Sequence, residues 1–148
     1  MIISKTPLRI SFMGGGTDIP SYYNSNNFGS VISSTIDKYI YVTIKKQLPI
    51  FYEKFRLNYS ETELVNTIDQ IKNPIIRECL NYMNIKDTLY ISTIADVPAS
   101  SGLGSSSAFC VGLLNALYAF KGKKINLKQL AKEAAIIEIK LLNKPIGE

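Results

Sequence analysis

The sequence predicts an α+β fold, on three observations. Apolar and polar residues alternate over much of the first sixty positions, which indicates strands. Two helical segments occupy the last third, and strands and helices do not alternate regularly along the chain. A length of 148 residues fits one domain. Hydrophobic residues make up 46% and charged residues 20%, which excludes disordered and low-complexity classes.

Three segments carry the alternation of early strands: Leu8–Met13, Tyr39–Ile44 and Phe51–Tyr59. A helical region is expected from about Leu64 to Met83, with an interruption near Pro74. Leu89–Val97 predicts a further strand, which Pro98 ends.

Two helices are expected at the C-terminal side of the chain. Ser105–Phe120 predicts an apolar, tightly packed helix. Asn126 is a suitable N-cap for a second helix from Leu127 to about Leu142, which Pro145 and Gly147 would end.

Charge and composition exclude several kinds of catalytic and metal-binding site. Seventeen basic against twelve acidic residues give a net charge of +5, and histidine is absent. The absence of histidine excludes Ser-His-Asp and Cys-His catalysis and all histidine metal sites. One dense basic patch comprises Lys121, Lys123, Lys124, Lys128 and Lys132. A solvated face is its ordinary explanation, since nucleic-acid binding calls for aromatic residues among the bases and only Phe120 is near.

Cysteines and hydropathy indicate a cytoplasmic protein. Cys79 and Cys110 lie in apolar stretches without C-x-x-C spacing, so we expect buried thiols in a reducing compartment. The first ten residues do not resemble a signal peptide, and no apolar stretch approaches the roughly 20 residues of a membrane span. No membrane partner is therefore expected.

The segment from Asp96 to Ala108 joins the last strand to a helix through a loop of small residues. Gly102 and Gly104 allow a ligand to approach the backbone closely, and the serines that follow lie at a helix N-terminus, where unpaired amides attract an anion. The alternative is a serine N-cap after an ordinary glycine turn. A P-loop is excluded because no lysine follows Gly104, and a dinucleotide loop because its third glycine is replaced by Ser107.

Two further signals stand elsewhere in the chain. Gly14–Gly16 directly follow a strand, and Asp18 offers a carboxylate to sugar hydroxyls; a glycine turn with an Asx cap is the alternative. Glu138 falls within an expected apolar stripe, which comprises Leu127, Leu130, Ala131, Ala134, Leu141 and Leu142. A carboxylate there needs donors or a cation, so it either forms a structural salt bridge or faces a metal.

Val97–Ala108 resembles the second motif of the GHMP kinases, P-x-G-x-G-L-G-S-S-[AS], and Pro7–Asp18 resembles their first motif in the form P-[LG]-R-I-x-x-x-G-G-G-T-D. That form is similar to the D-glycero-D-manno-heptose 7-phosphate kinase branch, which phosphorylates the anomeric hydroxyl of a sugar phosphate. The resemblance runs over nearly the whole chain. It implies an N-terminal domain of the ribosomal protein S5 domain 2-like type spanning residues 1–148, with ATP and Mg²⁺ as cofactors and a sugar or sugar phosphate as substrate.

The resemblance also implies roles for individual residues. The ATP phosphates would be held by Pro98, Ala99, Ser100, Ser101, Gly102, Leu103, Gly104, Ser105, Ser106 and Ser107. Ser106 and Glu138 would ligate magnesium. The sugar would face Arg9, Gly15, Gly16 and Asp18. Gly15 and Gly16 replace the Glu-His pair of galactokinases, which favours a sugar phosphate over galactose.

Two departures from the family pattern leave alternatives open. Ser100 stands where the family prefers glycine. The family continues past the position of Glu148 into its catalytic aspartate and a third glycine-rich motif, so the chain is expected to be a fragment of a longer kinase with its catalytic residue unknown. The alternatives are an inactive truncated fragment that at most binds nucleotide, another GHMP small-molecule kinase, or a nucleic-acid-binding S5-like module. The oligomeric state stays open.

Overall fold

The fold is described by a computed structural model that covers residues 1–143, so Pro145 and Gly147 lie outside the described residues. Five strands form one sheet: β1 (Ile2–Met13), β2 (Ile32–Lys46), β3 (Phe55–Asn58), β4 (Thr62–Val65) and β5 (Leu89–Ala95). Their spatial order is β1-β2-β5-β3-β4, with β3 parallel to β5 and every other neighbouring pair antiparallel. The α+β prediction is confirmed.

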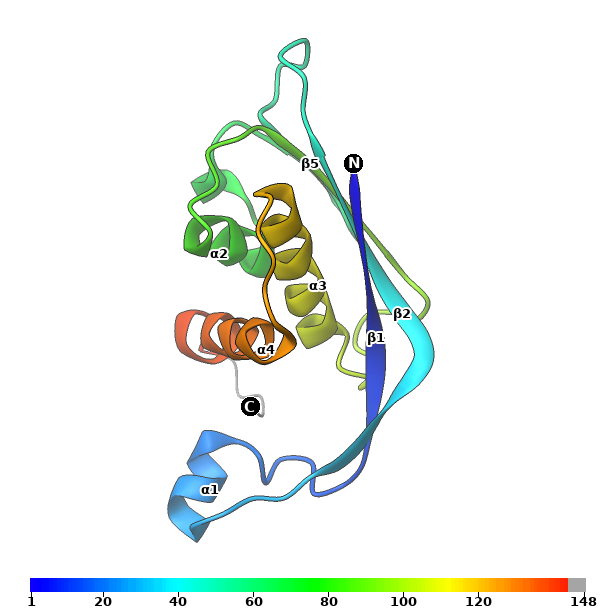
Figure 1. The fold of residues 1–148 in the computed structure, drawn as a ribbon, viewed down its shortest axis with the longest axis vertical. Helices are drawn as coiled ribbons and strands as arrows, with labels where there is room; N and C mark the ends of the chain where they lie inside the picture. The colour runs from blue at the N-terminus through cyan, green and yellow to red at the C-terminus, as the bar shows by residue number, and fades with distance from the viewer. Residues whose placement is uncertain (144–148) are drawn as a thin grey trace.

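The helical elements are α1 (Pro20–Asn26), the 3₁₀ turn η1 (Ile68–Gln70), α2 (Pro74–Tyr82), α3 (Ser105–Phe120), α4 (Leu127–Ala135) and the π-helical turn η2 (Ile136–Leu141). Figure 1 shows α2, α3 and α4 together on one side of the sheet, while the opposite face carries no helix in the part of the chain described. The sheet therefore has one buried and one outer face.

Helix α3 begins and ends at the predicted residues and lies at the centre of the core. Leu113, Leu114 and Leu117 are fully buried. Gly112 brings the helix close to β1, because a Cβ atom at residue 112 would lie 2.7 Å from Thr6 Oγ1.

The expected helix from Leu64 to Met83 is wrong in its first half, where residues 62–65 form β4 instead. Helix α2 begins only at Pro74, where a missing N–H is harmless, and Asn73 caps it by accepting a hydrogen bond from Ile76 N at 3.1 Å. The predicted strand from Phe51 is also shortened, to β3. Helix α1 was not predicted: it lacks a side-chain N-cap, and Pro20 at its first position is its one start signal among those described.

Glu63 connects β4 to the segment that leads into α2. Its carboxylate is buried and accepts hydrogen bonds from Tyr59 Oη at 2.6 Å, Lys72 N at 2.7 Å and Asn73 N at 3.1 Å. Burial alone raises the pKa of this carboxyl, but the three hydrogen bonds outweigh it and hold the pKa below its usual value.

The expected buried thiols are confirmed: Cys79 and Cys110 are inaccessible, with their Sγ atoms 3.9 Å apart. Their contact, together with burial, raises the pKa of the Cys79 thiol. All five lysines of the dense patch are exposed, as a solvated face requires, and Lys121 Nζ also donates to the carbonyl of Met83 at the end of α2. Within residues 1–143, no helix combines the length and apolar character that crossing a bilayer demands.

We predict that Glu63→Gln lowers the free energy of unfolding by about 1–3 kcal/mol at pH 7, because a neutral amide accepts these hydrogen bonds less strongly. The Glu63 carboxyl has a lowered pKa in the folded state. Its contribution is therefore complete above its unfolded pKa and is lost as the pH falls through its folded value. Urea unfolding at pH 7 and at pH 3 should show the difference between wild type and variant shrinking at the lower pH. A difference independent of pH would contradict this role.

Candidate functional site

The loop from Val97 to Gly104 leaves the sheet at an anchored strand end. Asp96 Oδ2 accepts a hydrogen bond from Tyr39 N at 2.8 Å, and Asp96 N donates to Tyr39 O at 3.0 Å. Beyond this anchor the backbone enters the left-handed region at Ser100, Gly102 and Gly104, with φ values of 63°, 75° and 72°. The two glycines accommodate this conformation, whereas a serine is strained in it.

The loop delivers the chain to the N-terminus of α3. Gly104 is the N-cap residue, and no side chain caps this end of the helix within the described residues, so the alternative of a serine N-cap is wrong. Ser105, Ser106 and Ser107 form the first turn of this helix. The backbone amides of a first turn and the positive end of a 16-residue helix dipole favour an anion such as phosphate here.

A pocket of about 470 Å³ adjoins this end of the helix. Ser100, Ser105 and Ser106 line it on one side, and its other walls are mainly apolar, with contributions from Tyr59, Ile75, Val97 and Phe109. Thr93 also lines it, and the Thr93 hydroxyl is buried without a hydrogen-bond partner in the described structure. Apolar walls, an unsatisfied hydroxyl and a helix N-terminus together suit a ligand that combines a ring system with phosphate.

A second pocket, of about 290 Å³, lies on the other side of the α3 N-terminus. It brings together charged and hydroxyl side chains from four parts of the chain: Arg9, Ser11, Asp18, Ser33, Ser107 and Glu138. Arg9 Nη1 donates to Ser11 Oγ at 2.7 Å, and Asp18 Oδ1 accepts from Gly16 N at 3.1 Å. A cation and a carboxylate facing one pocket suit a polyhydroxylated ligand that carries an anionic group.

Arg9 joins this pocket to the loop. Its backbone N–H donates to Leu103 O at 3.1 Å. A Cβ atom at residue 104 would lie 3.2 Å from Arg9 Cγ, so a glycine there lets the arginine pack against the loop.

The three consecutive glycines differ in whether the structure requires a residue without a side chain. Gly14 has φ of 78°, and a Cβ atom there would lie 1.9 Å from Ser30 O, so the tight bend predicted from the sequence is confirmed at this residue. Gly16 has φ of 93° and open space around it. Gly15 and Gly16 are not among the residues that line the second pocket, although both belong to the same turn as Asp18.

Glu138 reaches the helix N-terminus from the far end of the chain. It is 1% exposed, and its Oε1 accepts a hydrogen bond from Ser106 Oγ at 2.8 Å. The expected inward position is thus confirmed, but the expected stripe is partly wrong. Leu130 and Ala134 are buried, whereas Leu127 is 82% exposed and Leu141 is 47% exposed.

The helical period changes before Glu138 because α4 ends at Ala135 and continues as a π-helical turn. Leu142 N donates to Ile137 O, an i→i+5 hydrogen bond. Ile137 and Glu138 are both buried in this wider turn.

Ser106 and Glu138 could hold a hard cation, since a hydroxyl and a carboxylate oxygen already lie within contact distance. Residues 1–143 contain no cluster of three or more acidic, cysteine or histidine side chains. A magnesium ion at this position would therefore take its remaining ligands from water and from phosphates of a bound ligand, as Mg²⁺ commonly does.

Sequence reasoning did not find Tyr59, Thr93 or Ser33 as pocket residues. Each lies on or beside a strand, and strand pairing, which a local sequence pattern does not reveal, decides which residues become its neighbours. A single hydroxyl belongs to no recognisable motif. The one available indication was that serine and threonine alternate with buried residues along these strands.

The chain is similar to known proteins in sequence and in fold. Residues 70–147 match the family model of the GHMP kinases N terminal domain. A D-glycero-alpha-D-manno-heptose 7-phosphate kinase from Campylobacter jejuni is 33% identical over 147 residues, an alignment that covers 93% of this chain and 43% of that protein.

Solved structures share the fold. A D-glycero-D-manno-heptose 1-phosphate kinase from Bacteriodes thetaiotaomicron superposes with a TM-score of 0.82 at 24% identity, covering 99% of this chain and 51% of that one. The mevalonate kinase of Methanococcus jannaschii superposes with a TM-score of 0.74 at 23% identity, covering 97% and 48%. The chain thus spans about half the length of the relatives it matches.

The strained serine of the loop yields a prediction with a matched control. Ser100→Gly relieves a left-handed conformation that costs an L-residue about 1–2 kcal/mol, and should leave stability unchanged or raised. Ser101→Gly, at a neighbouring residue without positive φ, should lower stability by about 0.5–1 kcal/mol through chain entropy. Urea unfolding of both variants measures the contrast; equal losses would show that Ser100 is not strained.

Proposed function

Because the chain belongs to the GHMP kinase family, we propose that it supplies the nucleotide-binding part of a sugar kinase, which transfers the γ-phosphoryl group of ATP to a sugar or sugar-phosphate hydroxyl. The mixed α+β fold of a GHMP N-terminal domain, which the resemblance implied, is confirmed by the family and structural matches. The observation that carries the proposal is the uncapped N-terminus of α3 between two pockets.

In this proposal, residues 98–107 wrap the ATP phosphates, with the amides of Ser105–Ser107 donating to phosphate oxygens. The larger pocket takes the base and ribose, and its unsatisfied Thr93 hydroxyl offers a hydrogen bond to them. Phosphoryl transfer depends chiefly on positioning and charge neutralisation, and both are properties of this helix end.

Magnesium would be held by Ser106 and Glu138, and when bound it would neutralise negative charge on the phosphates. Ser106 lines the larger pocket and Glu138 lines the smaller one, so the pair lies between the two candidate sites. A cation held by these two residues would supply positive charge next to both candidate sites. No described residue is assigned as the catalytic base.

The smaller pocket would take the acceptor. Arg9 suits a sugar phosphate because its guanidinium can bind phosphate through two parallel hydrogen bonds, and Asp18 can accept hydrogen bonds from sugar hydroxyls. The turn of Gly15 and Gly16 lies beside Asp18 and would face the sugar. We propose a heptose 7-phosphate as the substrate, supported by the relative that is 33% identical.

Specificity is testable by calorimetry on the 148-residue chain in the presence of a non-hydrolysable ATP analogue and Mg²⁺. Heptose 7-phosphate should bind at least tenfold more tightly than galactose, mevalonate or homoserine. Arg9→Gln should weaken the sugar phosphate by about tenfold and leave an unphosphorylated heptose nearly unaffected, since a hydrogen bond to a charged group is worth about 1.5–3 kcal/mol. Preference for galactose or mevalonate would overturn the substrate assignment.

The role of Glu138 can be separated from a structural ion pair. If it holds magnesium, Glu138→Gln should leave the unliganded stability equal or better and abolish Mg²⁺-dependent nucleotide binding. If it neutralises a buried cation, the same change should cost about 3–5 kcal/mol. Thermal unfolding with and without ATP·Mg distinguishes the two.

Glu133→Gln is the matched control for this measurement. Glu133 is also buried on the same helical segment, but its carboxylate accepts hydrogen bonds from Tyr118 Oη and Gln129 Nε2, both at 2.8 Å. We expect the control to lose stability and keep nucleotide binding. A Glu138 variant that behaves in the same way would refute metal ligation.

A further inference from the structure

The outer face of the sheet carries both cations and aromatic rings. Residues that alternate with the buried ones on β1, β2, β5 and β3 include three cations, Lys5, Lys45 and Arg56. The same face bears Tyr39, Tyr41 and Tyr90, and no acidic residue occupies an outward position from Ile3 to Pro7, Tyr39 to Lys45, Arg56 to Asn58 or Tyr90 to Ile94. Aromatic rings and bases are therefore interleaved here, as they are not in the dense lysine patch.

Strand register sets three of these residues in one row. Lys45 pairs with Tyr90 across β2 and β5, and Arg56 pairs with Tyr90 across β3 and β5. The row forms one wall of a pocket of about 280 Å³, which the loop after β2 completes with Leu48 and Phe51. Tyr90 stands near the start of β5, and the phosphate loop leaves its other end, so this pocket is separate from the candidate kinase site.

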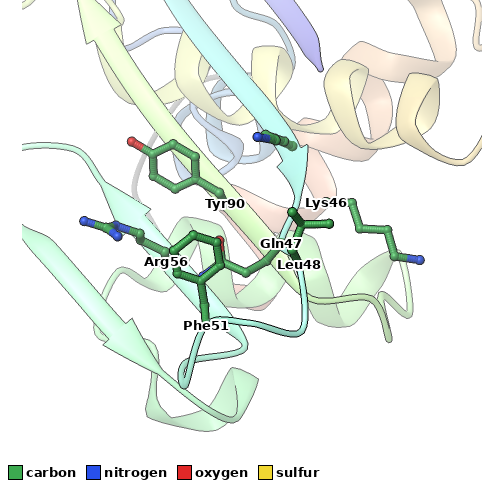
Figure 2. Close-up of a pocket in the computed structure, with 7 residues that line it drawn as sticks. Lys46, Gln47, Leu48, Phe51, Arg56 and Tyr90 are labelled. Atoms are coloured by element: carbon green, nitrogen blue, oxygen red, sulfur yellow. The ribbon is translucent and has the colours of Figure 1, made fainter.

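Figure 2 shows Tyr90 and Arg56 extending from neighbouring strands, with Phe51 on the loop beside them and the ammonium group of Lys46 directed to the other side. Asn58 Nδ2 donates to Tyr90 Oη at 2.8 Å, which holds the ring. The guanidinium carbon of Arg56 lies 5.9 Å from the ring centroid, within cation–π range. Phe51 is 44% exposed, a large apolar ring left open to solvent.

The charges in this pocket are unequally neutralised. Lys46 is paired with Asp87 at 2.7 Å, and Arg56 lies at the limit of an ion pair with Glu53, at 3.9 Å. Lys45 has no ion pair among the described residues. Lys45 and Arg56, on either side of Tyr90, are thus the cations that an incoming anion would meet.

Farther along the same face, a second cation lies close to aromatic rings. Lys5 Nζ lies 3.8 Å from the ring centroid of Tyr39 and 5.9 Å from that of Tyr41. The two rings are tilted by 50° with their centroids 6.2 Å apart. The face therefore offers rings and cations along a line, a surface for a chain with repeating rings and phosphates.

We propose that this outer face binds single-stranded nucleic acid, and that the pocket of Lys45, Phe51, Arg56 and Tyr90 holds one nucleotide of it. The base stacks on the exposed ring of Phe51 beside the half-buried Tyr90, and the phosphates lie against the cations. A second copy of the chain is a poorer occupant, because a symmetric contact through this face would oppose like charges.

The test is fluorescence anisotropy of a labelled ten-nucleotide poly-dT strand with the 148-residue chain at low salt. We expect binding that weakens with salt along a log–log slope of about −2, for three phosphate contacts. Phe51→Ala and the double variant Lys45→Gln, Arg56→Gln should each weaken binding by about tenfold or more. Lys124→Gln, combined with Lys123→Gln in the same dense lysine patch, removes the same two charges as the double variant and should leave binding nearly unchanged. Thermal unfolding of each variant verifies that it is folded.

Three competitors identify what is recognised. An abasic strand of the same length and a poly-glutamate peptide should compete at least tenfold more weakly than poly-dT, and excess ATP·Mg should not displace the strand. Equal competition by the abasic strand or the peptide would overturn base recognition, and displacement by ATP·Mg would return the ligand to the phosphate loop. Absence of binding by the wild type at low salt, or equal loss in the combined Lys123→Gln, Lys124→Gln control, would overturn the proposal as a whole.

Discussion

The close packing of α3 against β1 and β2 is the constraint on which the remaining structure depends. The helix is apolar around most of its circumference, so it must be covered by the sheet on one side and by α2 and α4 on the other (Figure 1). Gly112 admits the side chain of Thr6 on β1 to near contact. Because this packing leaves little freedom in the helix axis, the direction of the α3 N-terminus is fixed by the core and not by the loop that precedes it.

A fixed helix end explains how distant segments meet there. Arg9 reaches it from β1, held to the loop by the hydrogen bond from its N–H to Leu103 O. Glu138 reaches it from beyond α4 and accepts a hydrogen bond from Ser106. The positive end of the helix dipole, the Arg9 guanidinium and the Glu138 carboxylate thus lie close together. The packing of the core fixes the positions of these charges.

Much of this was predictable where local chemistry decides the structure. The bounds of α3 and the cap of α4 follow from an apolar run and from Asn126, whose Oδ1 accepts from Gln129 N at 2.8 Å. The prediction of helix from Leu64 is wrong at strand β4, where three hydrogen bonds to the Glu63 carboxylate, none of them marked by a local pattern, hold a buried charge in a strand. The loop residues and Glu138 were identifiable as a candidate site, whereas Thr93 and the row of Lys45, Tyr90 and Arg56 depend on strand order, which no local pattern reveals.

The π-helical turn has a consequence for how this helix can vary. A turn closed by an i→i+5 hydrogen bond contains one residue more than an α turn, and each residue of an α-helix advances the side-chain direction by about 100°. The wider turn takes up its extra residue within one turn, so the helical segments before and after it keep nearly the directions that they have in a continuous α-helix. Deletion of a single residue within Ile136–Leu141 would therefore restore the α-helix without turning the segment beyond it. The length of this short interval can thus differ between related chains while a carboxylate still reaches Ser106.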